Sequence, residues 1–127
     1  MIRCNGVHKY YRSGTDKVHA LRGVDLYIEE PGFYASMGQS GSGKSTRLHL
    51  LAALDAPDEG ELFVSGGAVH TMSDRKATAF RRTEIGIIFQ QFNLIPTLTA
   101  QENIELPGLL AGDSQAKLRK RSGELLE

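Results

Sequence analysis

The residues best suited to chemistry form one glycine-rich run at positions 38–46, which reads Gly-Gln-Ser-Gly-Ser-Gly-Lys-Ser-Thr. This run matches the phosphate-binding pattern G-x-x-x-x-G-K-[ST] at every fixed position. Its glycines allow a tight turn that aims backbone N–H groups at one anion. Lys44 supplies a charge for the outer phosphates, and Ser45 supplies a hydroxyl for Mg²⁺. The residues expected to hold the nucleotide are Gly38, Ser40, Gly41, Ser42, Gly43, Lys44, Ser45 and Thr46.

The segments on either side of this run have the composition that such a loop requires. Residues 32–37 form a short apolar and aromatic stretch that predicts a buried strand, and residues 45–54 have a helical composition. A helix that begins at the loop turns its positive end toward the phosphates. A glycine-rich turn could match the pattern by accident, but the order of strand, loop and helix favours a nucleotide site.

Other segments predict a mixed fold. Residues 1–11 and 19–30 read as two strands joined by a polar turn, and Gly23 interrupts the alternation of the second strand as a β-bulge would. The remaining expected elements are a turn at 55–60, a strand at 61–65, a helix from 73 or 74 to about 82, a fully buried strand at 85–89, a short helix near 99–104 and a charged helix at 113–127.

The composition predicts one ordinary globular domain or part of one. The 127 residues include 15 basic and 15 acidic side chains, so net charge gives no support for electrostatic capture of nucleic acid or anionic lipid. Cys4 is the single cysteine and cannot form an internal disulfide. With no apolar run of membrane-spanning length and no signal peptide, we expect a cytoplasmic protein that does not insert into a membrane directly.

A longer segment resembles a known family. Residues 89–107, Phe-Gln-Gln-Phe-Asn-Leu-Ile-Pro-Thr-Leu-Thr-Ala-Gln-Glu-Asn-Ile-Glu-Leu-Pro, are similar to the glutamine-loop region of ATP-binding-cassette (ABC) transporter ATPases. The resemblance is strongest to the subfamily that serves lipoprotein-release and macrolide-export permeases. Residues 20–24 and 54–61 resemble the same subfamily, so the likeness covers essentially the whole chain.

The resemblance implies roles for two residues outside the phosphate-binding run. Tyr11 corresponds to the aromatic that stacks on adenine, as an aromatic face can do with any base. Tyr10 is the alternative, and because neighbouring strand residues point to opposite faces, only one ring can serve. Gln90 corresponds to the glutamine that meets Mg²⁺ and the attacking water; the residue pattern alone does not separate Gln90 from Gln91.

The resemblance also implies the fold and the partners. We expect an α/β protein with a P-loop NTPase core, that is, a partial parallel sheet with helices, and an N-terminal antiparallel β-subdomain. Residues 1–30 and about 60–70 would form the β part, 31–59 and 71–95 the core, and 96–127 the start of a helical subdomain. The partners would be membrane permease subunits and a second ATPase subunit in a homodimer or heterodimer, at the inner face of the plasma membrane.

Several parts of the family's catalytic machinery are absent from this sequence. It contains no Leu-Ser-Gly-Gly-Gln run and no apolar strand that ends in Asp-Glu, and its four histidines all precede Gln90. We therefore expect Mg-ATP to bind without efficient hydrolysis by this chain alone. A non-catalytic nucleotide-binding module or a truncated gene product is the alternative, and exposed strand edges would make the chain prone to aggregation. A kinase or GTPase is disfavoured because no Asn-Lys-x-Asp run is present.

Arg47 departs from the family pattern, in which position 47 is apolar. Helical spacing places Arg47 on the side of Leu50, Leu51 and Leu54. A charge in that place either extends its head to water or lowers stability. The alternative is that Arg47 adds a cation near the nucleotide.

Overall fold

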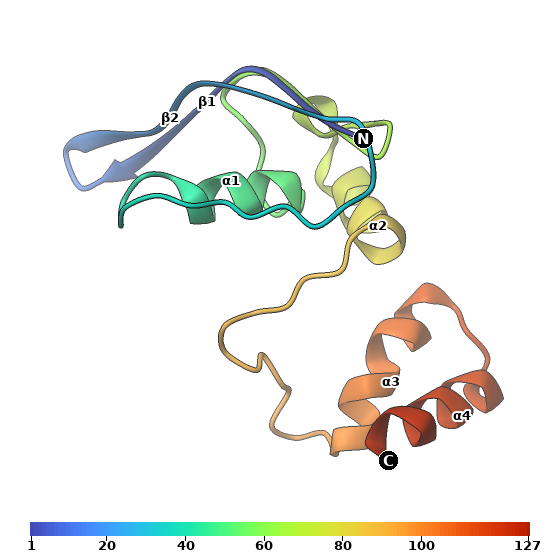
Figure 1. Cartoon of the computed structure of the whole chain (residues 1–127). Coiled ribbons are helices and arrows are strands. Elements are labelled where there is room, and N and C mark those ends of the chain that lie inside the picture. The colour runs from blue at the N-terminus through green and yellow to red at the C-terminus, as the bar shows by residue number, and fades with distance from the viewer. The chain divides into compact units, whose positions relative to one another are not determined.

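The computed structural model describes residues 1–127, apart from the side chain of Ser13. The chain forms two compact units, Met1–Glu84 and Ile85–Glu127, each described by itself below (Figure 1).

The first unit contains a four-stranded sheet. Strands β1 (Ile2–Ser13) and β2 (Asp16–Ile28) form a long hairpin, and β3 (Glu59–Val64) and the short β4 (Gly67–Ala68) complete the order β2-β1-β3-β4. All three pairings are antiparallel, which confirms the predicted antiparallel β part. The partner of Val7 is Val24 and that of Lys9 is Leu21, so β2 holds one extra residue there. This bulge contains Gly23, as its interruption of the alternation predicted.

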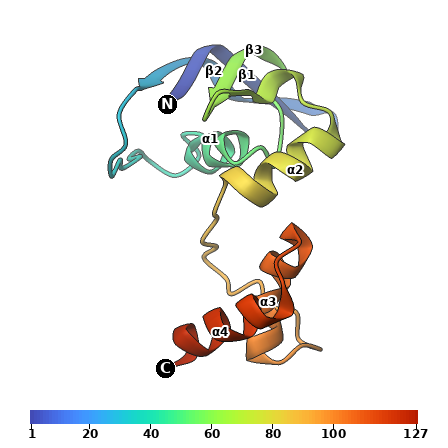
Figure 2. The same cartoon turned by 90° about the vertical axis from the view of Figure 1, so that its right-hand side faces the viewer.

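Three helical segments accompany the sheet in this unit. They are α1 (Lys44–Leu51), the 3₁₀ turn η1 (Val69–Thr71) and α2 (Asp74–Glu84). In Figures 1 and 2, α1 and α2 lie on the same side of the sheet, and the Arg81 guanidinium of α2 donates to the carbonyl of Ala53 at 2.6 Å. Helix α1 ends earlier than predicted because Ala53 adopts a left-handed backbone with φ of 51°.

The core of the first unit lies between the sheet and α1. Its buried apolar side chains come from β1, β2, α1 and its end, β3 and η1: Cys4, Val7, Leu21, Leu50, Ala53, Leu62, Val64 and Val69. Gly60 permits the close approach of β3 to β1, because a Cβ there would overlap the carbonyl oxygen of Gly6. Its φ of +85° also lies in the region that side chains rarely adopt. Contacts between distant parts of the sequence therefore determine this unit.

The second unit consists of an extended segment followed by helices α3 (Ala100–Ala111) and α4 (Gln115–Leu126). The predicted short helix near 99–104 extends further than expected, across Pro107. Proline removes one helical hydrogen bond, but a capping box at one end and a left-handed Gly112 at the other stabilise the full length. The predicted charged helix is confirmed as α4. Among the described residues, no helix combines the length and apolar character needed to cross a membrane.

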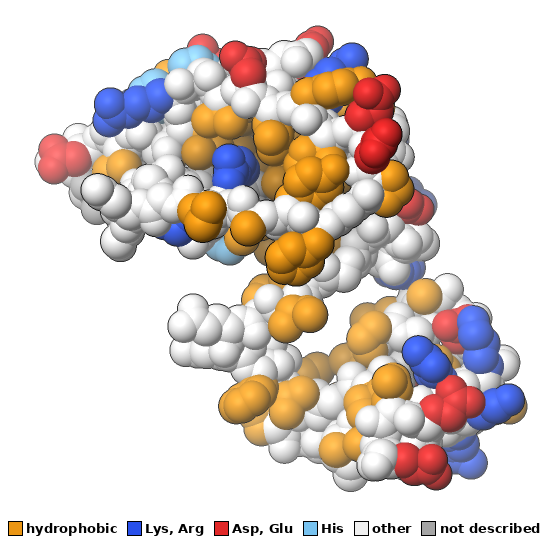
Figure 3. Space-filling model, in the orientation of Figure 1, with side chains coloured by type: hydrophobic (Ala, Val, Ile, Leu, Met, Phe, Trp, Pro, Cys, Tyr) orange, Lys and Arg blue, Asp and Glu red, His pale blue; other side chains and the backbone are white. Residues whose placement is uncertain are grey.

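Two strand predictions are wrong, because the segments do not form strands in this structure. Residues 32–37 and 85–89 have no strand conformation, and Phe33 and Ile88 are 99% and 100% exposed. A parallel strand requires neighbours brought from distant parts of the chain, whereas every ladder in the described part of the chain joins antiparallel strands. The two apolar segments thus remain exposed, and apolar side chains gather on the visible surface of each unit (Figure 3).

Candidate functional site

The glycine-rich run folds into a loop that surrounds the Lys44 ammonium group. Lys44 Nζ donates to the carbonyl oxygens of Gly38 at 2.7 Å and Gln39 at 2.6 Å. The backbone N–H of Ser42 closes a turn onto Gln39 at 3.2 Å. Ser45 follows in the first turn of α1 and is exposed. The loop therefore brings together a fixed cation, a hydroxyl and the N-terminus of a helix, which are the parts that bind a phosphate chain with its metal.

Gly43 shows why this loop needs glycine. It precedes α1 with φ of 85°, and its carbonyl accepts the first helical hydrogen bond, from the Arg47 N–H at 2.9 Å. A Cβ on this residue would lie 2.7 Å from the carbonyl oxygen of Ala20 and 2.8 Å from Leu21 Cδ2. Because β2 packs so closely against the loop, only glycine fits here.

An open cavity of about 600 Å³ adjoins the loop. Its lining comes from β2 and the loop with the start of α1: Val18, His19, Ala20, Arg22, Ser40, Gly41, Gly43, Lys44, Ser45 and Thr46. Arg22 and Lys44 give this cavity two cationic side chains, which suits a polyphosphate. The sequence does not indicate the β2 wall, because only the fold places residues 18–22 beside the loop.

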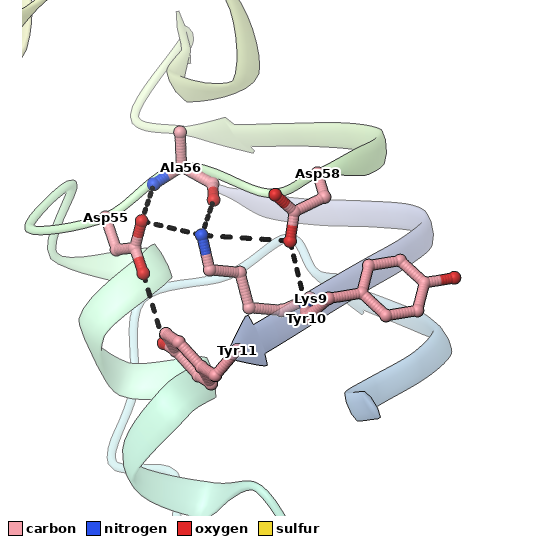
Figure 4. Close-up of polar contacts among 6 residues, drawn as sticks. All are labelled: Lys9, Tyr10, Tyr11, Asp55, Ala56 and Asp58. Carbon is pink, nitrogen blue, oxygen red and sulfur yellow. Dashed lines mark hydrogen bonds and ion pairs between the residues drawn. The ribbon is translucent and has the colours of Figure 1, made fainter. Parts of the chain in front are cut away.

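Tyr10 and Tyr11 lie on opposite faces of β1, as neighbouring residues of a strand do. The Tyr10 ring stacks on His19, with ring centroids 4.2 Å apart, and the Lys17 ammonium lies 3.7 Å from the Tyr10 centroid. The Tyr11 hydroxyl donates to Asp55 Oδ2 at 3.0 Å (Figure 4). Both tyrosines pair across the hairpin with residues of the cavity wall, Tyr10 with His19 and Tyr11 with Val18. Tyr10 is occupied by its own stack, whereas Tyr11 faces the side of α1.

A buried lysine joins β1 to the turn that follows α1. Lys9 is only 7% exposed, and its Nζ contacts Asp55 Oδ1 and the Ala56 carbonyl oxygen, each at 2.7 Å, and Asp58 Oδ2 at 3.8 Å. Asp58 Oδ2 also accepts the Tyr10 backbone N–H at 2.7 Å (Figure 4). This lysine and its acceptors form the Lys9 network. One signal could have found it, because Lys9 occupies the same strand face as the buried Val7.

The pKa of Asp55, a member of the Lys9 network, is lowered, and the pKa of Tyr11, which donates to Asp55, is raised. Burial alone would raise the pKa of the Asp55 carboxyl, but hydrogen bonds from Lys9, the Ala56 N–H and Tyr11 outweigh it and lower that pKa. Burial and the hydrogen bond to Asp55 raise the pKa of the Tyr11 phenol. Asp55 is therefore an anion at neutral pH, and Tyr11 remains a hydroxyl donor.

Arg47 lies beside the phosphate loop. Its guanidinium donates to the Ser36 hydroxyl, and the side chain helps to line a second cavity of about 180 Å³ together with Gly38 and Lys44. Arg47 is half-buried while Leu50, one turn later, is fully buried. The Arg47 side chain thus contacts a polar partner beside the loop, although the next turn of α1 packs into the core.

Gln90 and Gln91 are both exposed in the second unit, so the roles predicted for Gln90 stay predictions. The histidines lie in the first unit. His8 Nδ1 and His19 Nε2 share a hydrogen bond of 2.9 Å, and His70 packs edge-on against Phe63. Within the described residues, no three His, Cys, Asp or Glu side chains gather as metal ligands would.

Known proteins resemble this chain over its whole length. A family model described as ABC transporter matches residues 21–126. An uncharacterized ABC transporter ATP-binding protein of Methanocaldococcus jannaschii is 47% identical over 127 residues, which are 100% of this chain and 57% of the relative. The lipoprotein-releasing system ATP-binding protein LolD of Saccharophagus degradans is 42% identical, over 100% of this chain and 56% of the relative.

A solved structure has the same fold. It is the dimeric post-hydrolysis state of the ATP-binding cassette MJ0796 bound to ADP and Pi, with a TM-score of 0.89 and 43% identity over 98% of this chain and 55% of that one. This likeness confirms the predicted fold class, a partial P-loop NTPase with an N-terminal β-subdomain. The chain spans about half the length of the curated relatives it matches. On these findings, the chain belongs to the ABC transporter family, in which it corresponds to the N-terminal half of the ATP-binding domain.

Proposed function

We propose that this chain is the ATP-binding part of an ABC transporter ATPase, which couples ATP binding and hydrolysis to transport through a membrane permease. The observation that carries the proposal is the phosphate loop of residues 38–46. Its backbone surrounds the Lys44 ammonium, and it opens onto the cavity of about 600 Å³. The close contacts around Gly43 leave no room for a side chain, so the loop has the shape of an anion cradle.

Each predicted site residue has a role in this proposal. The loop N–H groups and Lys44 would hold the phosphates of ATP, Ser45 would give its hydroxyl to Mg²⁺, and Tyr11 would stack on adenine. Gln90 would meet Mg²⁺ and the attacking water. Bound Mg²⁺ would neutralise charge on the outer phosphates, so the chain's own part is to position them.

Hydrolysis by this chain alone is expected to be inefficient. The sequence contains no Leu-Ser-Gly-Gly-Gln run and no strand that ends in Asp-Glu, and the transfer of a phosphoryl group needs a residue that orients or deprotonates water. A non-catalytic nucleotide-binding module is therefore the second candidate.

The partners belong to the proposal too. The relative from Saccharophagus degradans is named as part of a lipoprotein-releasing system, and the solved cassette is dimeric. By the same arrangement, this chain would act as a homodimer or heterodimer bound to permease subunits, in the cytoplasm at the inner face of the plasma membrane.

Calorimetric titration with Mg-ATP tests the nucleotide site. Lys44→Ala should weaken binding by about tenfold or more, because it removes a charge-assisted contact with phosphate. Lys117→Ala, which removes an exposed lysine of α4, is the matched control and should bind as the unmodified chain does. Equal affinities for the unmodified chain and Lys44→Ala would contradict the proposal.

A phosphate-release assay tests the second candidate. Binding that depends on Lys44, without phosphate release by the unmodified chain or by Lys44→Ala, is the result that both candidates predict for this chain alone, whereas phosphate release by the unmodified chain would exclude the non-catalytic module. Turnover by the unmodified chain would show that it hydrolyses ATP without the missing motifs.

A further inference from the structure

We propose that Asp55 is a positioning residue for the nucleotide base, whose carboxylate holds the Tyr11 ring in the orientation in which it stacks on adenine. This inference rests on the proposed function, because it assumes that Tyr11 meets the base. It adds a residue outside the phosphate loop, 44 positions along the chain from Tyr11.

The two oxygens of the Asp55 carboxylate bond different groups. Oδ1 accepts from Lys9 Nζ at 2.7 Å and from the Ala56 N–H at 2.8 Å, while Oδ2 accepts from the Tyr11 hydroxyl at 3.0 Å (Figure 4). Two bonds to Oδ1 fix the rotation of the carboxylate, so the direction of Oδ2 is fixed as well. The acceptor for Tyr11 is thus rigid, and it carries the charge that makes such a hydrogen bond strong.

Lys9 holds this carboxylate in place from inside the protein. Its ammonium is buried and also donates to the Ala56 carbonyl at 2.7 Å, so it is attached both to the Asp55 side chain and to the backbone that follows. A buried charge with several acceptors has little freedom to move. The orientation of Tyr11 therefore depends on a chain of contacts that begins in the core of the first unit.

The Tyr11 ring has the placement that a stacking platform needs. The Lys9 ammonium lies over the ring, 5.4 Å from its centroid, yet the residue remains 37% exposed and so offers surface to a ligand. Tyr11 pairs across the hairpin with Val18, which lines the cavity beside the phosphate loop. A ring already fixed by its hydroxyl loses less conformational entropy when a base stacks on it, which raises affinity for the base.

Two ligands separate the contribution of the base to binding affinity from that of the phosphates. Calorimetric titration with Mg-ATP measures both contributions, and titration with inorganic tripolyphosphate and Mg²⁺ measures the phosphate contribution alone. Tyr11→Phe removes only the hydroxyl and leaves the Lys9–Asp55 ion pair in place. Asp55→Ala removes the acceptor, and Asp113→Ala, which removes a carboxylate of similar exposure paired to Lys117, is the matched control.

We expect Tyr11→Phe and Asp55→Ala each to weaken Mg-ATP binding about three- to tenfold, because each variant loses only part of the affinity that one base–aromatic stack contributes. Their tripolyphosphate affinity should stay within about twofold of the unmodified chain, because no phosphate contact changes. The double variant should bind Mg-ATP as each single variant does, since Asp55 acts through Tyr11. Asp113→Ala should bind both ligands normally.

Three results would overturn the inference: unchanged Mg-ATP affinity in Tyr11→Phe, equal losses for ATP and tripolyphosphate in Asp55→Ala, or additive losses in the double variant. Equal losses would mean that Asp55 only stabilises the fold around the loop. The proposed function fails by a different result, namely Mg-ATP and tripolyphosphate affinities that Lys44→Ala does not change.

Discussion

The two units of this chain differ in what covers their apolar side chains. In the first unit, Val7, Leu21, Leu50 and Leu62 come from four different elements and are all buried. In the second unit, Leu118 and Ser122 are the buried residues among those described, and apolar residues such as Ile88 are exposed. The first unit is thus built on contacts between distant parts of the sequence, and the second mainly on its two helices.

Local signals account for much of the second unit. Thr99 and Glu102 form a capping box at the start of α3, Gly112 ends that helix with φ of 90°, and Ser114 caps α4. Between the helices, Ser122 donates to Glu105 at 2.7 Å. Substitutions should therefore lower stability strongly where distant elements meet, and elsewhere by about as much as the loss of one helix cap.

The largest expected effect is at Leu62, which is 1% exposed at the centre of the sheet. Leu62→Ala should lower the free energy of unfolding by about 2–5 kcal/mol, the usual cost of a cavity in a core. Ile88→Ala, at a fully exposed position, should change it by less than about 0.5 kcal/mol. Urea unfolding followed by circular dichroism measures both free-energy changes. Losses of similar size would contradict the proposed difference between the two units.

The next effect contrasts two lysines, each paired with an aspartate. Lys9→Met leaves Asp55 and the Ala56 carbonyl without a buried donor and should cost about 2 kcal/mol, less than a fully buried pair because Asp55 is one-third exposed. Lys117→Met breaks an exposed pair on α4 and should cost about 0.5 kcal/mol or less. The same unfolding experiment checks both values. A larger loss of stability in Lys117→Met than in Lys9→Met would contradict the expectation that the pair in the first unit contributes more.

In both units, how much the sequence could predict depends on whether neighbouring or distant residues determine a segment. The phosphate loop, the β1–β2 hairpin, the bulge at Gly23 and helix α2 were predicted, because neighbouring residues determine them. Residues 32–37 and 85–89 were predicted as strands from their apolar character alone. A buried parallel strand needs apolar side chains, but it also needs neighbouring strands, which the apolar character of a segment does not provide.

Within the candidate site, sequence reasoning identified the loop and the family resemblance singled out Tyr11, but it did not find what lies around them. Asp55 is 46 residues from Lys9, and no local pattern joins them. The wall formed by β2, with His19 and Arg22, likewise depends on how the hairpin lies against the loop. For Lys9 the sequence held one signal, because a charged residue at a core-facing strand position needs a buried partner. The sequence does not show which residue that partner is.

A smaller effect is expected at the cap of α3. Thr99→Ala removes a side chain that accepts from the Glu102 N–H and donates to the Glu102 carboxylate, and should cost about 1 kcal/mol of helix stability. Thr99→Ser keeps the hydroxyl and is the control. Circular dichroism during thermal unfolding measures the loss, and a Thr99→Ala protein as stable as Thr99→Ser would show that the second unit does not depend on its caps.

The smallest effect is a difference in acid sensitivity between the units. Burial, followed by the charges of His8 and Arg22, lowers the pKa of His19 in the first unit. Below about pH 6.5 the unfolded chain therefore binds more protons at His19 than the folded chain does, so stability falls as pH falls. In the second unit, hydrogen bonds from Thr99 lower the pKa of Glu102, and the stability that they give is lost only below about pH 4.5.

Unfolding measured at intervals between pH 4 and pH 8 should therefore show two separate losses. His19→Asn should flatten the curve below about pH 6.5, where the unfolded chain takes up protons at this histidine. Glu102→Gln should flatten only the part near pH 4. A loss of stability below about pH 6.5 that persists in His19→Asn would show that His19 does not cause it and would contradict this prediction.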